Sequence, residues 1–215
     1  MEDVVLIDKP KGWTSFDVVG KIRSQLRKST GQKVKVGHAG TLDPLATGLL
    51  IVLVGKATKQ QDSFMKQDKV YEVTMKLGQT STTADEEGEK TTISDRQPSL
   101  QEVQDAIKQF EGEISQVPPA YSAIKINGQR AYKLARAGKE VVIEPRKVTI
   151  YSVDHLRYEY PLIRFTTKVS SGTYIRSLVT DIGEALATGA YMTDLRRTHI
   201  GAYSIENAKD NSYLQ

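Results

Sequence analysis

The twelve residues Gly37–Gly48, GHAGTLDPLATG, constrain this chain more than any other stretch. Their three glycines and one proline set special backbone angles and favour a loop. Asp43 precedes Pro44, which pushes its backbone toward an extended conformation and away from helix. The spacing matches neither a P-loop nor a dinucleotide-binding loop. From residue types alone two interpretations stay open: Asp43 ties off a turn, or its carboxylate takes part in chemistry.

Composition places the chain among globular proteins. Of its 215 residues, 39% are hydrophobic and 26% charged. The longest apolar run, Leu49–Val54, is far shorter than the ~20 residues of a membrane span. The acidic start of the chain argues against a secretory signal. Cysteine is absent and the three histidines are scattered, so we expect a cytoplasmic protein without disulfides or a metal centre.

The net charge of +4 is unevenly distributed. Residues 9–35 hold eight Lys/Arg against one Asp, and residues 125–147 hold seven against two Glu. Each segment alone could be a solvated surface. Two cationic segments on an otherwise acidic chain favour a polyanionic partner. Both segments lie next to the sequence motifs on which the functional predictions rest, so we expect the partner to be a nucleic acid.

The hydrophobic pattern predicts one α+β domain with a mixed or antiparallel sheet. Capping signals place helices after Thr14 and after Ser99, and Phe16 falls with Val19 and Ile22 on the apolar face of the first. A short basic helix is expected over 130–137 and another helix from about Thr173. Strands are expected at residues 4–7, 49–54, 70–77, 141–143, 148–153, 162–169, 192–195 and 199–205.

Arg176 is predicted in the first turn of a helix, the wrong end for a cation because the helix dipole is positive there. At the border of the buried face it needs a carboxylate or phosphate partner. Asp181 would give a structural salt bridge, whereas Asp43 would be held ionised and oriented by the pairing. Asp85, in an acidic loop, is expected to cap a turn.

A series of short motifs runs in order through almost the whole chain. They are Leu6–Pro10, Trp13–Ser15, Val36–Gly48, Lys69–Glu72, Leu77–Thr80, Pro118–Lys125, Gly128–Tyr132, Gly172–Leu178 and Leu195–Thr198. In these motifs the chain resembles the bacterial TruB family of tRNA pseudouridine-55 synthases. The resemblance implies the pseudouridine synthase fold, with a central, mostly antiparallel mixed sheet, flanking helices and a catalytic cleft. It also implies isomerisation of uridine 55 in the T loop of tRNA.

The resemblance also assigns roles. Asp43 matches the essential aspartate, Tyr71 the active-site tyrosine and Arg176 the arginine that pairs with the aspartate. His38 matches the histidine that holds the T loop open, and Leu195 lines the uracil pocket. Residues 125–147 are expected to clamp the RNA. The remaining residues expected to contact substrate or RNA are Lys9, which binds phosphate or supports the loop, and Lys59, Lys125, Arg130, Lys133, Arg136 and Tyr174.

Breaking the N1–C1′ bond, turning the uracil and rejoining it through C5 consumes no other group, so no cofactor is expected. The residues leave open whether Asp43 attacks C1′, attacks C6 or removes the C2′ proton. We expect no membrane association and no obligatory protein partner. About fifteen residues follow Ile200, too few for the family's usual C-terminal PUA domain, so one catalytic domain over residues 1–215 is expected. The alternatives are an RNA chaperone that folds the tRNA elbow and a guide-dependent pseudouridine synthase subunit.

Overall fold

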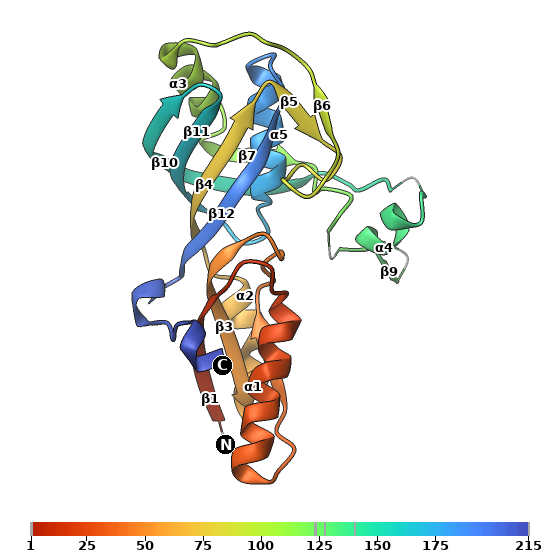
Figure 1. Ribbon diagram of the computed structural model, residues 1–215, viewed down its shortest axis with the longest axis vertical. Coiled ribbons are helices and arrows are strands. Elements are labelled where there is room, and N and C mark those ends of the chain that lie inside the picture. Colours follow the sequence, from red (N-terminus) through yellow and green to blue (C-terminus); the bar gives the residue numbers. More distant parts are fainter. Residues whose placement is uncertain (1, 123, 127, 140, 215) are drawn as a thin grey trace. The chain divides into compact units, whose positions relative to one another are not determined.

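The computed structural model describes residues 2–122, 124–126, 128–139 and 141–214 (Figure 1). The chain forms two compact units. Unit 1 comprises the residues up to Glu72 and those from Leu195 onward, and unit 2 comprises Val73–Asp194. The chain leaves unit 1 within strand β4 (Lys69–Leu77) and returns to it within strand β12 (Ala190–Ile200).

Unit 1 is built around β3, a strand with buried side chains on both faces. It pairs antiparallel with β1 and β2, and its first residues pair parallel with the end of β12. Leu50, Val52 and Val54 face helix α1, whereas Leu49, Ile51 and Leu53 face the segment of η1 and α2. The elements of this unit besides β4 and β12 are β1 (Glu2–Lys9), α1 (Ser15–Thr30), β2 (Val36–Ala39), β3 (Thr47–Gly55), η1 (Lys56–Gln60), α2 (Gln61–Met65), β13 (Tyr203–Ser204), η2 (Ile205–Asn207) and η3 (Asn211–Leu214).

Helix α1 begins with the predicted capping box. The Thr14 side chain accepts the Asp17 N–H, and the Asp17 carboxylate accepts the Thr14 N–H. Val19 and Ile22 are buried, as the apolar pattern predicts. Phe16 is not: its side chain is 66% exposed, so its placement on the core face was wrong. Ser15, in the same first turn, is buried, whereas Phe16 lies about 100° round the helix from it, beside the face that Ser15 shares with Val18 and Ile22.

Unit 2 consists of a β-sheet together with helices α3, α4 and α5. Its strands are hydrogen-bonded in the order β12, β4, β11, β10 and β7, and the β11/β10 and β10/β7 pairs are antiparallel. Helix α3 begins at the predicted Ser99 capping box. Besides parts of β4 and β12, the unit contains β5 (Gln79–Ser81), β6 (Lys90–Thr92), α3 (Leu100–Lys108), β7 (Gly112–Gln116), β8 (Lys125–Ile126), β9 (Gln129–Arg130), α4 (Ala131–Arg136), β10 (Arg146–Glu159), β11 (Leu162–Val169) and α5 (Ile175–Ala185).

Several boundaries differ from the sequence predictions. The loop predicted over residues 37–48 is shorter in the structure, because residues 37–39 belong to β2 and residues 47–48 belong to β3. Residues 141–143 form no strand, and β12 continues through residues 196–198, which the pattern left out. The α+β class with a mixed sheet is confirmed, since antiparallel pairs and the parallel β3/β12 pair occur together.

Candidate active site

Asp43 lies in the loop that joins β2 to β3. Its neighbours Leu42 and Leu45 are buried, so the loop is anchored on both sides of the partly buried aspartate. The Asp43 carbonyl accepts the Ala46 N–H at 3.1 Å and closes a turn. The loop is therefore a packed structural element, and its aspartate is held at a defined place.

Arg197 holds both ends of this loop. Its side chain is 1% exposed and donates from Nε to the Leu49 carbonyl at 2.8 Å. Nη2 donates to the Gly40 carbonyl at 3.1 Å, and Nη1 to the Thr41 carbonyl at 3.5 Å. A buried guanidinium must be matched by acceptors, and here the acceptors are backbone carbonyls on either side of Asp43.

Gly48 is required by this arrangement. Its backbone φ angle is +101°, a conformation that residues other than glycine rarely adopt. A Cβ atom at this position would lie 2.3 Å from the Arg197 carbonyl oxygen, which belongs to the paired backbone of β12. The glycine at position 48 is thus explained by the close approach of β3 and β12. This approach lets the Arg197 side chain reach the loop.

The start of α1 is fastened to the same loop. The buried Ser15 hydroxyl accepts the Leu42 N–H at 2.9 Å and donates to the Leu42 carbonyl at 3.1 Å. Nearby, the Gly12 N–H donates to the Pro44 carbonyl at 2.8 Å. Both residues next to Asp43 are therefore tied to the segment that begins α1.

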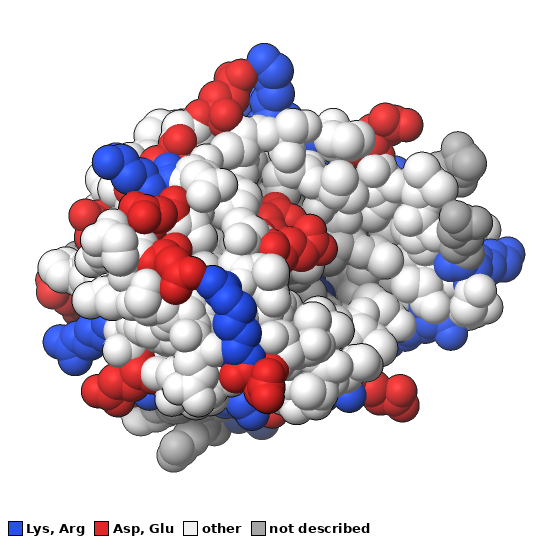
Figure 2. Space-filling model, turned by 90° about the horizontal axis from the view of Figure 1, so that it is seen from above, with Lys and Arg blue, Asp and Glu red and all other residues white. Residues whose placement is uncertain are grey.

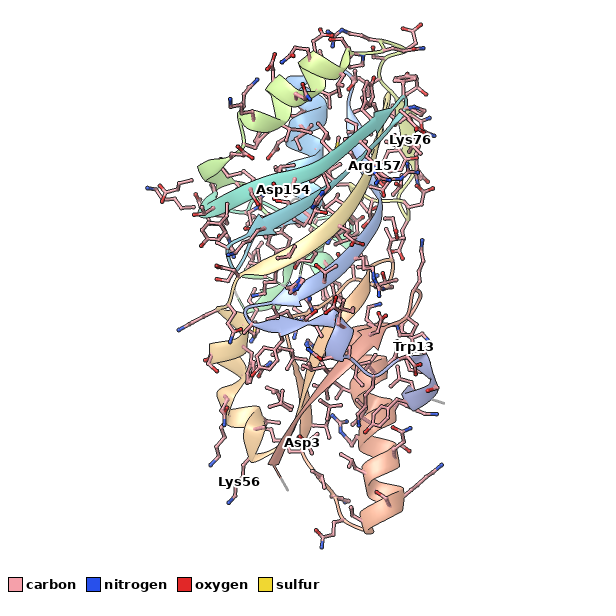
Figure 3. All side chains as sticks on the ribbon, turned by 90° about the vertical axis from the view of Figure 1, so that its left-hand side faces the viewer. Asp3, Trp13, Lys56, Lys76, Asp154 and Arg157 are labelled. Atoms are coloured by element: carbon pink, nitrogen blue, oxygen red, sulfur yellow. The ribbon has the colours of Figure 1, made fainter. Side chains whose placement is uncertain are left out.

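Lys9 lies beneath the loop and is fully buried. Its ammonium donates to the carbonyls of Pro10 at 2.9 Å, Trp13 at 2.6 Å and Pro44 at 3.4 Å. Burial lowers the pKa of Lys9 to about 8, although the nearby negative charge of Asp43 opposes this shift. Trp13, labelled in Figure 3, packs against the hydrophobic cluster under α1. These contacts make Lys9 a support of the loop.

Four other residues singled out from the sequence lie in unit 1. His38 is on β2, and its ring makes an edge-to-face contact with Phe16. Tyr71 on β4 and Leu195 on β12 are both buried, whereas Lys59 on η1 is exposed. Burial at 71 and 195 fits a core residue as well as a pocket wall, so their roles stay predictions.

Arg176 lies in the first turn of α5 in unit 2 and is buried. Its Nη1 is 3.4 Å from the buried Asp85 carboxylate and donates to the Thr83 carbonyl at 3.1 Å. Nη2 donates to the Tyr121 carbonyl at 2.8 Å. Asp85 also accepts the Glu87 N–H at 3.1 Å, so it caps a turn as predicted and in addition pairs with an arginine that the sequence did not connect to it.

Asp181, the structural partner considered for Arg176, lies further along α5. Burial raises the pKa of its carboxyl group to about 6, and the charge of Glu184 adds to the shift. Tyr174 precedes α5, and its backbone N–H and carbonyl bond the buried Gln116 side chain at 2.7 and 3.1 Å.

The four predicted cations of the RNA-clamping segment are exposed on an excursion between β7 and β10 (Figure 1). They are Lys125, Arg130, Lys133 and Arg136. The Arg136 guanidinium lies 5.6 Å from the Tyr132 ring centroid. On the face shown in Figure 2, acidic and basic side chains are interspersed. That face therefore carries no large area of a single charge, and only small groups of cations on it could attract a polyanion.

Two further arrangements were not foreseen from the sequence, the Arg197 clamp and an ion pair between Asp8 and Arg196. The two Arg196 Nη atoms lie 3.1 and 2.7 Å from the two Asp8 carboxylate oxygens. The two adjacent arginines near the end of β12 could have signalled both, because neighbouring side chains of a strand point to opposite faces. Among the described residues, no group of three His, Asp or Glu could hold a metal ion, and no helix is long and apolar enough to cross a membrane.

Comparison with known proteins identifies the family. The model "TruB family pseudouridylate synthase (N terminal domain)" matches residues 27–175, about two thirds of the chain. The chain belongs to the TruB family. The model "tRNA pseudouridylate synthase B C-terminal domain" matches residues 176–215 of this TruB-family enzyme. The expectation of one domain over residues 1–215 stays a prediction.

Relatives of this TruB-family enzyme are similar over nearly its whole length. The tRNA pseudouridine synthase B of Clostridium novyi is 49% identical over 97% of this chain and 70% of that protein. The protein of the same name from Parabacteroides distasonis is 45% identical over 95% of this chain and 88% of its own length. A solved Cbf5-Nop10-Gar1 complex contains a chain 32% identical, with a TM-score of 0.72, over 96% of this chain. This TruB-family chain spans about half of that one (51%).

Proposed function

We propose that this enzyme converts uridine 55 in the T loop of tRNA to pseudouridine, with Asp43 as its essential carboxylate. The family and the names of the relatives support a tRNA uridine as substrate. The observation that carries the proposal is the loop around Asp43. Arg197 holds its ends, Ser15 binds the residue before the aspartate, and Lys9 binds the residue after it.

This construction suits a catalytic carboxylate. An ionised group that must meet C1′ or C6 of one nucleotide needs a fixed direction, because a misplacement of about 1 Å can cost about a hundredfold in rate. Three separate tethers on the backbone fix the direction without using the Asp43 side chain itself. The Lys9 ammonium adds a positive charge near Asp43.

The target uridine must leave the stack of the loop before a protein carboxylate can reach its sugar. We propose that Arg176 takes part in the reaction, as the resemblance implies, and that Tyr71 handles the proton at C5. In unit 2 the Arg176 side chain is already oriented by Asp85 and by two carbonyls. The exposed cations Arg130, Lys133 and Arg136 are proposed to contact phosphates and offset the cost of unstacking.

The proposal is tested with the full chain, a tRNA transcript and a transcript in which only position 55 is changed. Wild-type enzyme is expected to release the C5 hydrogen of uridine 55, measured as tritium from [5-³H]uridine. Asp43→Asn is expected to abolish release while it binds tRNA within about threefold of wild type. Asp62→Asn, an exposed carboxylate on α2, is the matched control and should keep full activity.

Two outcomes would contradict the proposal. Product formation by Asp43→Asn would remove Asp43 from the chemistry, and product at a uridine other than 55 would correct the substrate position. An RNA chaperone of the tRNA elbow would accelerate tRNA folding in wild type and Asp43→Asn alike without forming pseudouridine.

A guide-dependent subunit is a second candidate, because one structural relative belongs to a Cbf5-Nop10-Gar1 complex. The higher identity to proteins named tRNA pseudouridine synthase B favours a stand-alone enzyme. Activity of the purified chain on a bare tRNA transcript would exclude the requirement for a guide.

A further inference from the structure

Phe16 is a bulky aromatic side chain that unit 1 leaves in contact with solvent. It is the second residue of α1, and 66% of it is exposed, whereas Val18 and Val19 beside it are buried. A single exposed hydrophobic residue is common on protein surfaces and needs no function. The contacts around Phe16, however, indicate that its exposed ring is held in a defined position.

The Phe16 ring is held by a specific contact. Its centroid lies 5.3 Å from that of the His38 ring, and the two planes are inclined by 87°. This edge-to-face arrangement is attractive for aromatic rings and fixes their relative orientation. His38 belongs to β2, the strand that leads directly into the loop of Asp43. The exposed ring is therefore positioned beside that loop.

The backbone that carries Phe16 is also tied to the loop. The preceding residue, Ser15, exchanges two hydrogen bonds with the backbone of Leu42, the residue before Asp43. The capping box between Thr14 and Asp17 closes around Phe16 and fixes the first turn of the helix. Phe16 has only two side-chain torsions, so little conformational entropy is lost when a ligand contacts its ring.

We propose that an unstacked base of the substrate RNA, adjacent in space to the target uridine, stacks on the Phe16 ring. When one nucleotide leaves a loop, its neighbours lose a stacking partner, and an aromatic side chain can replace it. Seven and eleven residues further along α1, Arg23 and Arg27 lie on the same side of the helix as Phe16, and these cations suit the phosphates of an RNA strand that leads away from such a base. The inference rests on the proposed function, because it requires an RNA substrate.

The experiment measures binding of a T-stem-loop RNA to the full chain in an Asp43→Asn background, where the RNA is not turned over. Stacking of one base on an aromatic ring predicts a loss of roughly five- to a hundredfold in affinity for Phe16→Leu. Phe16→Tyr keeps the ring and should bind within about twofold of the parent. Tyr151→Ala removes an aromatic residue of β10 that is 50% exposed, and this matched control should leave affinity unchanged.

A spectroscopic readout separates stacking from a structural role. 2-Aminopurine, whose fluorescence is quenched when it stacks, replaces each unpaired base of the T loop in turn. At one position, binding to the parent and to Phe16→Tyr should quench the fluorescence, and binding to Phe16→Leu should not. Far-ultraviolet circular dichroism of each variant checks that α1 is intact.

Equal affinity and equal quenching for Phe16→Leu and its parent would overturn the inference while the proposed function stood. Unchanged RNA binding together with loss of a protein partner would assign Phe16 to a protein contact and would also overturn it. Failure of the enzyme with Asp43 intact to bind or modify the T-stem-loop would instead contradict the proposed function. The activity of wild type on the same RNA, measured in parallel, tells these results apart.

Discussion

Two buried lysines of unit 1 predict a pH dependence of stability. Lys9 is fully buried, and Lys69 nearly so, with its ammonium on the carbonyls of Met65 and Gln67. Burial lowers the pKa of each from 10.5 to about 8. Only Lys9 contacts the loop of Asp43, through the Pro44 carbonyl, so the pair offers a test and a matched control.

The magnitude follows from linkage. At pH 7 both the folded and the unfolded chain hold the proton on Lys9, and the folded state carries a penalty of about 3 kcal/mol for burying the charge. Between pH 8 and pH 10.5 the unfolded state binds more protons than the folded state, so the free energy of unfolding rises with pH. About 2 kcal/mol of the penalty is recovered for each lysine between pH 7 and pH 9.5.

The assay is urea unfolding at pH 7.0 and pH 9.5, followed by the fluorescence of Trp13, the single tryptophan of the chain. Lys9→Met and Lys69→Met should each reduce the rise in unfolding free energy between the two pH values by about 2 kcal/mol. At pH 7, Lys9→Met should also slow single-turnover tRNA modification by roughly three- to tenfold, because a charge-assisted bond to the loop is lost. Lys69→Met should leave that rate unchanged. A rise in Lys9→Met equal to that of wild type would refute the reasoning.

Three other substitutions and one control test which contacts stabilise unit 1 and what the buried Asp181 charge on α5 costs. Ser15→Ala leaves one backbone amide and one carbonyl without their buried partner, and urea titration should show a loss of about 2–4 kcal/mol. Gly48→Ala places a methyl group on the Arg197 backbone and should give little soluble protein on expression, whereas Gly12→Ala, at φ +84° in open space, should lower stability by only about 1 kcal/mol. For Asp181, whose folded pKa of about 6 lies above its unfolded value of 3.8, stability falls as pH rises between these values. Asp181→Asn should therefore stabilise the enzyme by about 1–2 kcal/mol at pH 7.5 and have no effect near pH 4, and a gain at pH 4 equal to that at pH 7.5 would contradict this account.

Much of the fold could be predicted because local signals and burial agree. The two capping boxes, at Thr14 and Ser99, occur where the sequence placed them, since a side chain three residues from its partner interacts whatever the rest of the chain does. Phe16 was misplaced because the buried face of α1 includes the polar Ser15, which the apolar pattern left out, and Phe16 lies beside that face.

Only part of the candidate site could be predicted from the sequence. The loop of Asp43 stands out in the sequence, since glycine and proline mark backbone conformations directly. The contacts that hold it come from residues distant in the chain. Arg197 is more than 140 residues from the carbonyls it binds, and the link between Asp85 and Arg176 spans about 90 residues. No periodicity reports such pairings, because they depend on how the strands are ordered in the sheet.

The clamp on the loop is made almost entirely with main-chain atoms. Arg197, Lys9 and Ser15 bind loop carbonyls, which every residue supplies, and Ser15 also binds the Leu42 amide, which every residue except proline could supply. Exposed side chains along the loop can therefore be exchanged without loosening it, as long as Gly48 and the buried Leu42 and Leu45 are kept. Exposed Thr41 is such a position, so mutational drift could adapt the rim to a different RNA while the acid at its centre stays where it is.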